Sequence, residues 1–158
     1  MMIANNVTRL LDNRKINYKA FELPRQKLDA EGTARFLNAP LSIIFKSIVI
    51  ERVNPGKPIL AVVPGDKEVN LKALAKVLGE KKVIPATQKN AENLTKLQAG
   101  GISPLALINR GFEIVIDDSV LNQEMIHISG GELGVNIRLN ARDLVDLTRA
   151  SVSNISRE

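Results

Sequence analysis

Residues 44–52 are the run that most constrains the fold of this 158-residue chain, because their alternation is typical of a β-strand. Both faces of this strand are largely apolar, with Ile44, Lys46, Ile48 and Ile50 on one face and Phe45, Ser47 and Val49 on the other. A strand with two apolar faces is typical of a central strand that is covered on both sides. The chain therefore needs a sheet with packing elements above and below it.

Lys46 interrupts the isoleucine row of this strand. An unpaired ammonium group in an apolar core would be too costly. Two interpretations stay open. Either the side chain reaches past the edge of the sheet into solvent, or it presents its charge at the floor of a cleft, opposite an anionic or carbonyl partner. The second interpretation would make Lys46 a functional residue.

The rest of the chain alternates irregularly between helices and strands. Apolar spacing and capping residues predict helices that begin after Asn5, Asp29, Asn70, Thr87 and Asn140. Strands are predicted near residues 18–21, 58–63, 83–84, 112–116, 125–129 and 135–139, with at least two hairpins among them. We predict a mixed sheet packed with helices in a single domain over residues 1–158, and a frayed tail over residues 151–158.

Two glycine clusters are candidates for loops that contact a ligand. Gly100 and Gly101 are adjacent, which removes side-chain bulk and lets a ligand approach the main chain, and Pro104 stiffens the loop. Gly130 and Gly131 follow the predicted strand at residues 125–129. Turn chemistry alone would make both clusters connections between strands, so other residues must decide between a connection and a pocket.

Composition argues against several kinds of site. The chain has no cysteine, which excludes disulfides, thiol nucleophiles and cysteine-bound metals and agrees with a cytoplasmic location. Its one histidine, His127, argues against a histidine metal site, and we expect no metal or cofactor. A serine activated by His127, with Ser129 on the same strand face, lacks an evident third group, so we expect His127 to be a polar residue on a half-exposed strand.

Charge and aromatic content bear on the partners. The net charge of +5 favours a polyanion, although the lysines and arginines are scattered. One tyrosine, four phenylalanines and no tryptophan argue against a base-stacking platform. Any nucleic acid would be held by phosphate contacts and one narrow pocket. No apolar run approaches the roughly 18 residues of a membrane span, so we expect no membrane partner.

Four motifs, in this order along the chain, resemble the YbaK family of free-standing editing proteins, which is related to the editing domain of bacterial prolyl-tRNA synthetases. Each motif is weak alone, but the shared order is specific and the resemblance covers nearly the whole chain. The motifs are Phe45-Lys46-Ser47-Ile48-Val49, residues 71–79 (Leu-Lys-Ala-Leu-Ala-Lys-Val-Leu-Gly), residues 100–105 (Gly-Gly-Ile-Ser-Pro-Leu), and Ile128-Ser129-Gly130-Gly131 followed by Gly134.

The resemblance implies an α/β (α+β) fold with a mixed, partly barrel-like sheet and helices around a cleft. It also implies an enzyme, an aminoacyl-tRNA deacylase. The cleft would receive the 3′ aminoacyl-adenosine end of a mischarged tRNA, mainly Cys-tRNA(Pro), and the aminoacyl ester would be broken there. Mischarged tRNA is the implied partner, and prolyl-tRNA synthetase is a candidate second partner.

The resemblance also assigns site residues. Lys46 falls on the family's lysine and would contact a phosphate or carbonyl of the terminal adenosine as a fixed charge. In related cysteinyl editors the substrate's own thiol attacks the ester and forms a thiolactone, which needs positioning more than a protein nucleophile. The implied substrate-binding residues are Phe45, Ser47, Gly100, Gly101, Ile102, Ser103, Pro104, Ser129, Gly130, Gly131 and Asn136.

Two positions depart from the pattern of many relatives. Ser47 stands in place of a threonine and keeps the hydroxyl group, whereas Asn136 stands in place of an aspartate and removes a negative charge. The amino group of the substrate would then be held differently, and the preference for cysteine or alanine stays open.

The alternative from another class is a non-catalytic module that binds tRNA ends or a synthetase. If the loop grips the substrate, a bulky residue at Gly101 should abolish deacylation and leave the fold intact.

Overall fold

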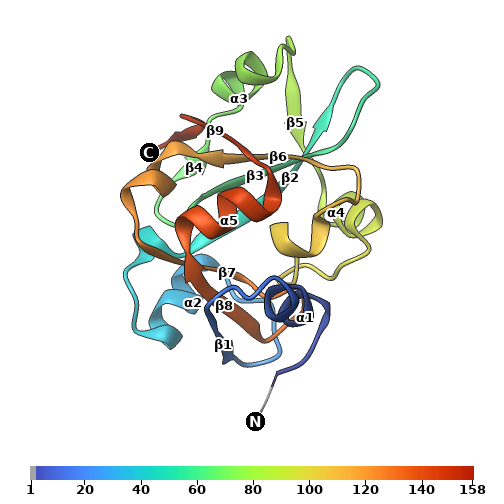
Figure 1. The fold of residues 1–158 in the computed structure, drawn as a ribbon. Helices are drawn as coiled ribbons and strands as arrows, with labels where there is room; N and C mark the ends of the chain where they lie inside the picture. The colour runs from blue at the N-terminus through green and yellow to red at the C-terminus, as the bar shows by residue number, and fades with distance from the viewer. Residues whose placement is uncertain (1–2) are drawn as a thin grey trace.

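Two sheets lie beside each other in the computed structural model, which describes residues 3–158 (Figure 1). The larger sheet has the order β5 (Val83–Pro85), β2 (Phe45–Arg52), β3 (Ile59–Pro64), β6 (Glu113–Asp117) and β9 (Ser151–Ser153). The smaller sheet has the order β1 (Tyr18–Glu22), β8 (Val135–Asn140) and β7 (Met125–Ser129). A separate antiparallel pair joins β4 (Glu68–Val69) to β10 (Ser156–Arg157).

Short helices surround the sheets and begin where the capping residues predict. The α-helices are α1 (Asn6–Asn13), α2 (Ala30–Leu37), α3 (Leu71–Leu78), α4 (Gln88–Thr95) and α5 (Ala141–Thr148), and the 3-10 turns are η1 (Leu41–Ile43), η2 (Pro104–Leu107) and η3 (Asp118–Asn122). The side chain of each predicted cap accepts a hydrogen bond from a backbone N–H two or three residues further on. Of the helices within residues 3–158, none has the length and apolar character needed to cross a membrane.

The larger sheet is buried on both faces, as the strand at residues 44–52 predicts. On one face, Phe45 and Val49 of β2 belong to a core that also contains residues of the smaller sheet, α1 and α5. On the other face, Ile50 packs in a second core with Leu74 of α3 and with Ile155. Every residue of β3, the neighbour of β2, is buried. The two cores hold β2 in a fixed position.

The expected mixed α/β fold is confirmed, but the strands of residues 3–158 do not close into a barrel. In the larger sheet β2 pairs antiparallel with β3 and β5, whereas β3 with β6 and β6 with β9 pair in parallel. An isolated parallel bridge between Ile44 and His127 links the start of β2 to β7 of the smaller sheet. This bridge brings together the two sheets from which the candidate site is built.

The prediction of a frayed tail over residues 151–158 is wrong. β9 extends the larger sheet, β10 pairs with β4, and the side chain of Ile155 between them is fully buried. The Ile155 N–H donates to Asp117 Oδ1 at 3.0 Å, and its carbonyl accepts from the Asn70 N–H at 2.7 Å. The short polar tail has little apolar periodicity of its own, so these distant contacts determine its conformation.

We expect Ile155→Ala to lower the free energy of unfolding by about 2–5 kcal/mol, because the truncation leaves a cavity in the second core. Urea denaturation measures this change. The matched control is Leu121→Ala at a side chain that is 62% exposed, where we expect a change within about 0.5 kcal/mol. Equal, small effects of the two substitutions would show that the tail contributes little to stability.

Candidate functional site

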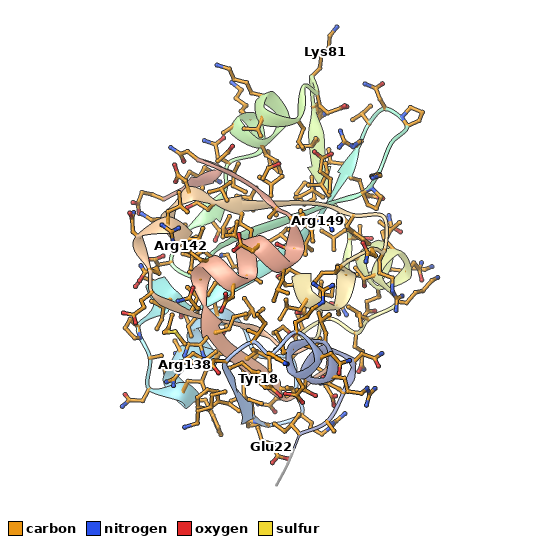
Figure 2. The ribbon with its side chains drawn as sticks, in the orientation of Figure 1. Tyr18, Glu22, Lys81, Arg138, Arg142 and Arg149 are labelled. Atoms are coloured by element: carbon orange, nitrogen blue, oxygen red, sulfur yellow. The ribbon has the colours of Figure 1, made fainter. Side chains whose placement is uncertain are left out.

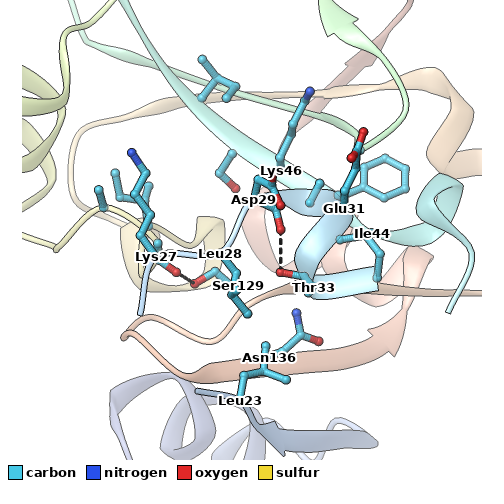
Figure 3. A pocket seen from close by; sticks show the side chains of 18 of the residues that line it. Leu23, Lys27, Leu28, Asp29, Glu31, Thr33, Ile44, Lys46, Ser129 and Asn136 are labelled. Carbon is cyan, nitrogen blue, oxygen red and sulfur yellow. Dashed lines mark hydrogen bonds between the residues drawn. The ribbon is translucent and has the colours of Figure 1, made fainter. Parts of the chain in front are cut away.

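A cavity of about 520 Å³ opens beside β2 (Figure 3). Its wall is formed by β2, by the N-terminal part of α2 with the loop before it, by β4, by the start of α4, by the loop at residues 99–102, and by the ends of β7 and β8 that face each other. Polar, charged and apolar side chains all line this space. Within residues 3–158, no three His, Cys, Asp or Glu side chains are grouped closely enough to hold a metal ion.

The edge of β2 that faces the cavity has a gap in its hydrogen bonding. The Ile44 carbonyl accepts from the Gly65 N–H on the β3 side, whereas the Val49 carbonyl accepts from the Ala86 N–H on the opposite side. Because backbone groups alternate along an antiparallel strand, the N–H and C=O of Ser47 also point away from β3. Within the described residues, β5 pairs with the last three residues of β2 and β7 meets β2 at its start. Ser47, which lines the cavity, therefore offers a main-chain donor and acceptor to a ligand.

Lys46 lies at the cavity with a carboxylate partner, which matches the second of the two interpretations. Its side chain is 25% exposed, and its Nζ is 3.5 Å from Oε1 of Glu68, which is itself 66% exposed. An ion pair this accessible to water contributes under about 1 kcal/mol. The ammonium group is therefore available to an anionic ligand that competes with Glu68.

Sequence reasoning missed Glu68 as a site residue. Glu68 belongs to the two-residue strand β4, and the partner of that strand is β10 in the C-terminal tail. Because the tail was expected to be frayed, nothing indicated a strand at residues 68–69. The one signal in the sequence is that the carboxylate of Glu68 follows shortly after the second strand of the hairpin that carries Lys46.

The two glycine clusters meet at the cavity. The Ser129 hydroxyl donates to the carbonyl of Gly100 at 3.2 Å, and the Gly131 N–H donates to the same hydroxyl at 3.4 Å. Gly100 has a φ of +91°, which L side chains rarely adopt, and it lines the cavity together with Ile102 and Ser129. Residues far apart in the sequence therefore form one continuous part of the wall.

Five of the loop residues implied by the resemblance do not line the cavity, and they lie behind its wall. The hydroxyl of Ser103, which is fully buried, accepts a hydrogen bond from the Leu105 N–H at the start of η2. A Cβ atom on either of the second pair of glycines would meet the side chain of Val135 or of Val7. The five residues are Gly101, Ser103, Pro104, Gly130 and Gly131.

Gly101 packs against main chain rather than facing the ligand space. A Cβ atom at this position would lie 2.9 Å from Cα of Glu132, in the turn between β7 and β8. A bulky side chain must therefore displace that turn. The expectation that a bulky residue at Gly101 would leave the fold intact does not fit this contact, because the turn between β7 and β8 would have to shift.

Phe45 and Asn136 also line the cavity, and both are nearly fully buried. His127 lies directly behind Asn136, with its Nδ1 atom 2.8 Å from Asn136 Oδ1. The expected half-exposed position of His127 is wrong, since the residue is 4% exposed and its ring packs against Phe21 at a centroid distance of 5.5 Å. His127 is therefore hydrogen-bonded to Asn136, and Ser129 to Gly100.

Burial lowers the pKa of the His127 imidazole below its ordinary value of 6.5. The hydrogen bond with Asn136 opposes this shift, whereas the positive charge of Arg138 acts in the same direction as burial. The ring is therefore neutral at pH 7.5.

We expect the ring protons of His127 to titrate with a midpoint below 6.5, and the only histidine of the chain can be followed by NMR without ambiguity. The unfolded chain binds this proton more readily than the folded chain, so His127 should make the protein less stable as the pH falls below 6.5. Urea denaturation at pH 7.5 and 5.5 gives the loss of stability in the wild type and in His127→Gln. The difference between the two losses is the contribution of His127. A midpoint at or above 6.5 would contradict the prediction.

Comparisons with known proteins identify the family. The family model described as the aminoacyl-tRNA editing domain matches residues 25–147. EbsC of Enterococcus faecalis, named as a candidate Cys-tRNA(Pro)/Cys-tRNA(Cys) deacylase, is 31% identical over 153 residues, which cover 96% of this chain and 92% of EbsC. The prolyl-tRNA editing protein ProX of Acetoanaerobium sticklandii is 22% identical over 151 residues, which cover 89% of this chain and 87% of ProX.

A solved structure supports the fold. The crystal structure of the hypothetical protein APE2540 matches with a TM-score of 0.88 at 24% identity and covers 97% of this chain and 100% of that chain. The chain belongs to the aminoacyl-tRNA editing domain family. This assignment confirms the YbaK-type resemblance and the prediction of an aminoacyl-tRNA editing enzyme.

Proposed function

We propose that this chain is a trans-acting deacylase that removes cysteine from mischarged Cys-tRNA(Pro). The observation that carries the proposal is the match along 96% of the chain to EbsC, whose name includes Cys-tRNA(Pro) beside Cys-tRNA(Cys). The cavity beside β2 is the proposed site for the 3′ aminoacyl-adenosine. Its volume of about 520 Å³ suits a small part of the tRNA and leaves the rest of the molecule outside.

Positive charge at the cavity supports binding of the tRNA end. Lys27 and Lys46 both line the space, and either ammonium can contact a phosphate of the terminal nucleotides. Other cations are spread over the molecule: Figure 2 shows Lys81 at the top of the view, Arg142 and Arg149 across the middle, and Arg138 near the bottom. The two lysines at the cavity are therefore the proposed anchors for the phosphate next to the ester.

Main-chain groups would orient the ester itself. The N–H of Ser47 points into the gap in the edge of β2 and can donate to the ester carbonyl, where negative charge develops during attack. Gly100 also lines the cavity, and the Ser129 hydroxyl donates to its carbonyl at this part of the wall. Lys46 adds its charge to the same region, as a contact to the phosphate or to the carbonyl.

The proposed chemistry uses the thiol of the substrate. The chain has no cysteine, and among the described contacts Ser129 is bonded to the Gly100 carbonyl and His127 to Asn136, so neither forms an activated serine. The cysteinyl sulfur would attack the ester carbonyl and lose its proton, and the ribose oxygen would leave and take up a proton. The product is cysteine β-thiolactone, which water opens to cysteine. Positioning of the thiol supplies most of the acceleration.

We expect Lys46→Ala to lower kcat/KM for Cys-tRNA(Pro) by about 10²-fold or more, because it removes a charge from the site where charge develops. Release of labelled cysteine measures this loss. The matched control is Lys72→Ala, which removes the same charge from an exposed position of α3 that does not line the cavity. Undiminished activity of Lys46→Ala would remove this lysine from the mechanism.

We expect Cys-tRNA(Pro) to be deacylated at least about 100-fold faster than Ala-tRNA(Pro), since alanine has no thiol that can cyclise. Both charged tRNAs are compared in one assay, and mass spectrometry follows the thiolactone. Equal rates would favour an alanine-editing enzyme of the same family. Binding of many aminoacyl-tRNAs without turnover would favour a non-catalytic module.

We place the reaction in the cytoplasm, where aminoacyl-tRNA is made and used, and propose prolyl-tRNA synthetase as a second partner. The name of ProX, a prolyl-tRNA editing protein, supports a link to the proline system. Deacylation of a panel of charged tRNAs, with and without the synthetase, tests whether tRNA selectivity resides in this chain or in the partner.

A further inference from the structure

His127 and Asn136 form a buried polar pair across β7 and β8 that the thiol chemistry does not use. Each residue is 4% exposed, and His127 Nδ1 lies 2.8 Å from Asn136 Oδ1. Asn136 lines the cavity, whereas His127 does not. The pair therefore has one member that can touch a ligand and one member that stands behind it.

The chemistry of the two groups fixes their roles in this contact. A carbonyl oxygen accepts hydrogen bonds and cannot donate them, so the proton of the neutral imidazole must be on Nδ1. With Oδ1 bonded to His127, the amide of Asn136 turns its Nδ2 donors away from the histidine. In Figure 3 the nitrogen of Asn136 points to the side on which Thr33, another residue that lines the cavity, is labelled.

The surroundings of His127 keep this arrangement in place. The ring of Phe21, on β1, packs against the imidazole, and the guanidinium of Arg138 lies 5.9 Å from the centre of the Phe21 ring. The imidazole is thereby shielded from water and lies near a positive charge, and both conditions disfavour a second proton. A neutral ring with one N–H has one donor to offer, and Asn136 accepts it.

We propose that His127 is a positioning residue that holds the Asn136 amide as a hydrogen-bond donor to an oxygen of the aminoacyl ester or the ribose. The nature of the ligand rests on the proposed function. An amide held in this way directs its Nδ2 donors, and not Oδ1, toward the ligand, so it is poorly placed to accept from the substrate's α-ammonium group. That group would instead meet one of the carboxylates that line the cavity, which belong to Asp29, Glu31 and Glu68.

The first test reads the tautomer directly and needs no activity. In protein labelled with ¹⁵N at pH 7.5, the one histidine gives one pair of ring nitrogen signals. We expect Nδ1 to carry the proton and Nε2 to be unprotonated. The opposite tautomer would overturn the proposal, because Nδ1 would then accept from the Asn136 amide and Oδ1 would face the cavity. This result is independent of whether Cys-tRNA(Pro) is the substrate.

The second test is a double-mutant cycle on kcat/KM with the tRNA that is deacylated fastest. We expect His127→Phe and Asn136→Ala each to lower kcat/KM about 10-fold, mainly through KM, as for the loss of one hydrogen bond. In the Asn136→Ala background, His127→Phe should cause no further loss beyond about twofold. Equal losses in both backgrounds would overturn the proposal and leave His127 a purely structural role.

A conservative variant separates loss of the hydrogen bond from a folding defect. His127→Gln keeps an N–H donor and should retain kcat/KM within about threefold, whereas His127→Phe keeps the ring volume and loses the donor. Thermal denaturation of each variant reports folding separately. If His127→Gln is folded and as impaired as His127→Phe, donation to Asn136 is not the role of the histidine. If no charged tRNA is deacylated by the wild type, the proposed function fails while the tautomer result stands.

Discussion

The hydrogen bonding of β2, continuous with β3 along one edge and interrupted along the other, is the constraint on which the rest of the site depends. Two cores fix the strand, so the position of its free edge is fixed as well. Consecutive side chains leave a strand on opposite faces. The Lys46 side chain leaves one face and reaches Glu68 of β4. The main-chain groups of Ser47 lie in the plane of the sheet and stay open to the cavity at the free edge. One strand supplies both a charge and neutral hydrogen-bonding groups.

The cavity combines two kinds of polar contact that differ in burial. The Lys46–Glu68 pair is accessible to water, so it can exchange partners at little cost in the presence of an anionic ligand. The His127–Asn136 pair is buried, and breaking it would leave polar groups without partners at a cost of about 1–3 kcal/mol. The first pair suits the capture of a charged ligand, and the second suits a fixed direction for a neutral donor.

Local chemistry made much of the fold predictable from the sequence. The helix caps and the strand at residues 44–52 depend on neighbouring residues, and the structure has them where the pattern indicates. The buried state of His127, the packing of Gly101 against Glu132 and the ordered tail around Ile155 depend on residues distant in sequence, which no local pattern contains. The motif order identified the family, but it did not separate residues that line the cavity from residues that pack behind it.

The gap at Ser47 also bears on self-association. An unpaired strand edge can template pairing with a second polypeptide, a route to aggregation that folded proteins limit by keeping edges short, covered or charged. Here the open stretch lies between the bridge at Ile44 and the bond from Ala86 to Val49. It is short and lies in the wall of a cavity that Lys46 also lines. The position of this stretch thus limits pairing with a second polypeptide, while its main-chain groups stay open to a ligand in the cavity.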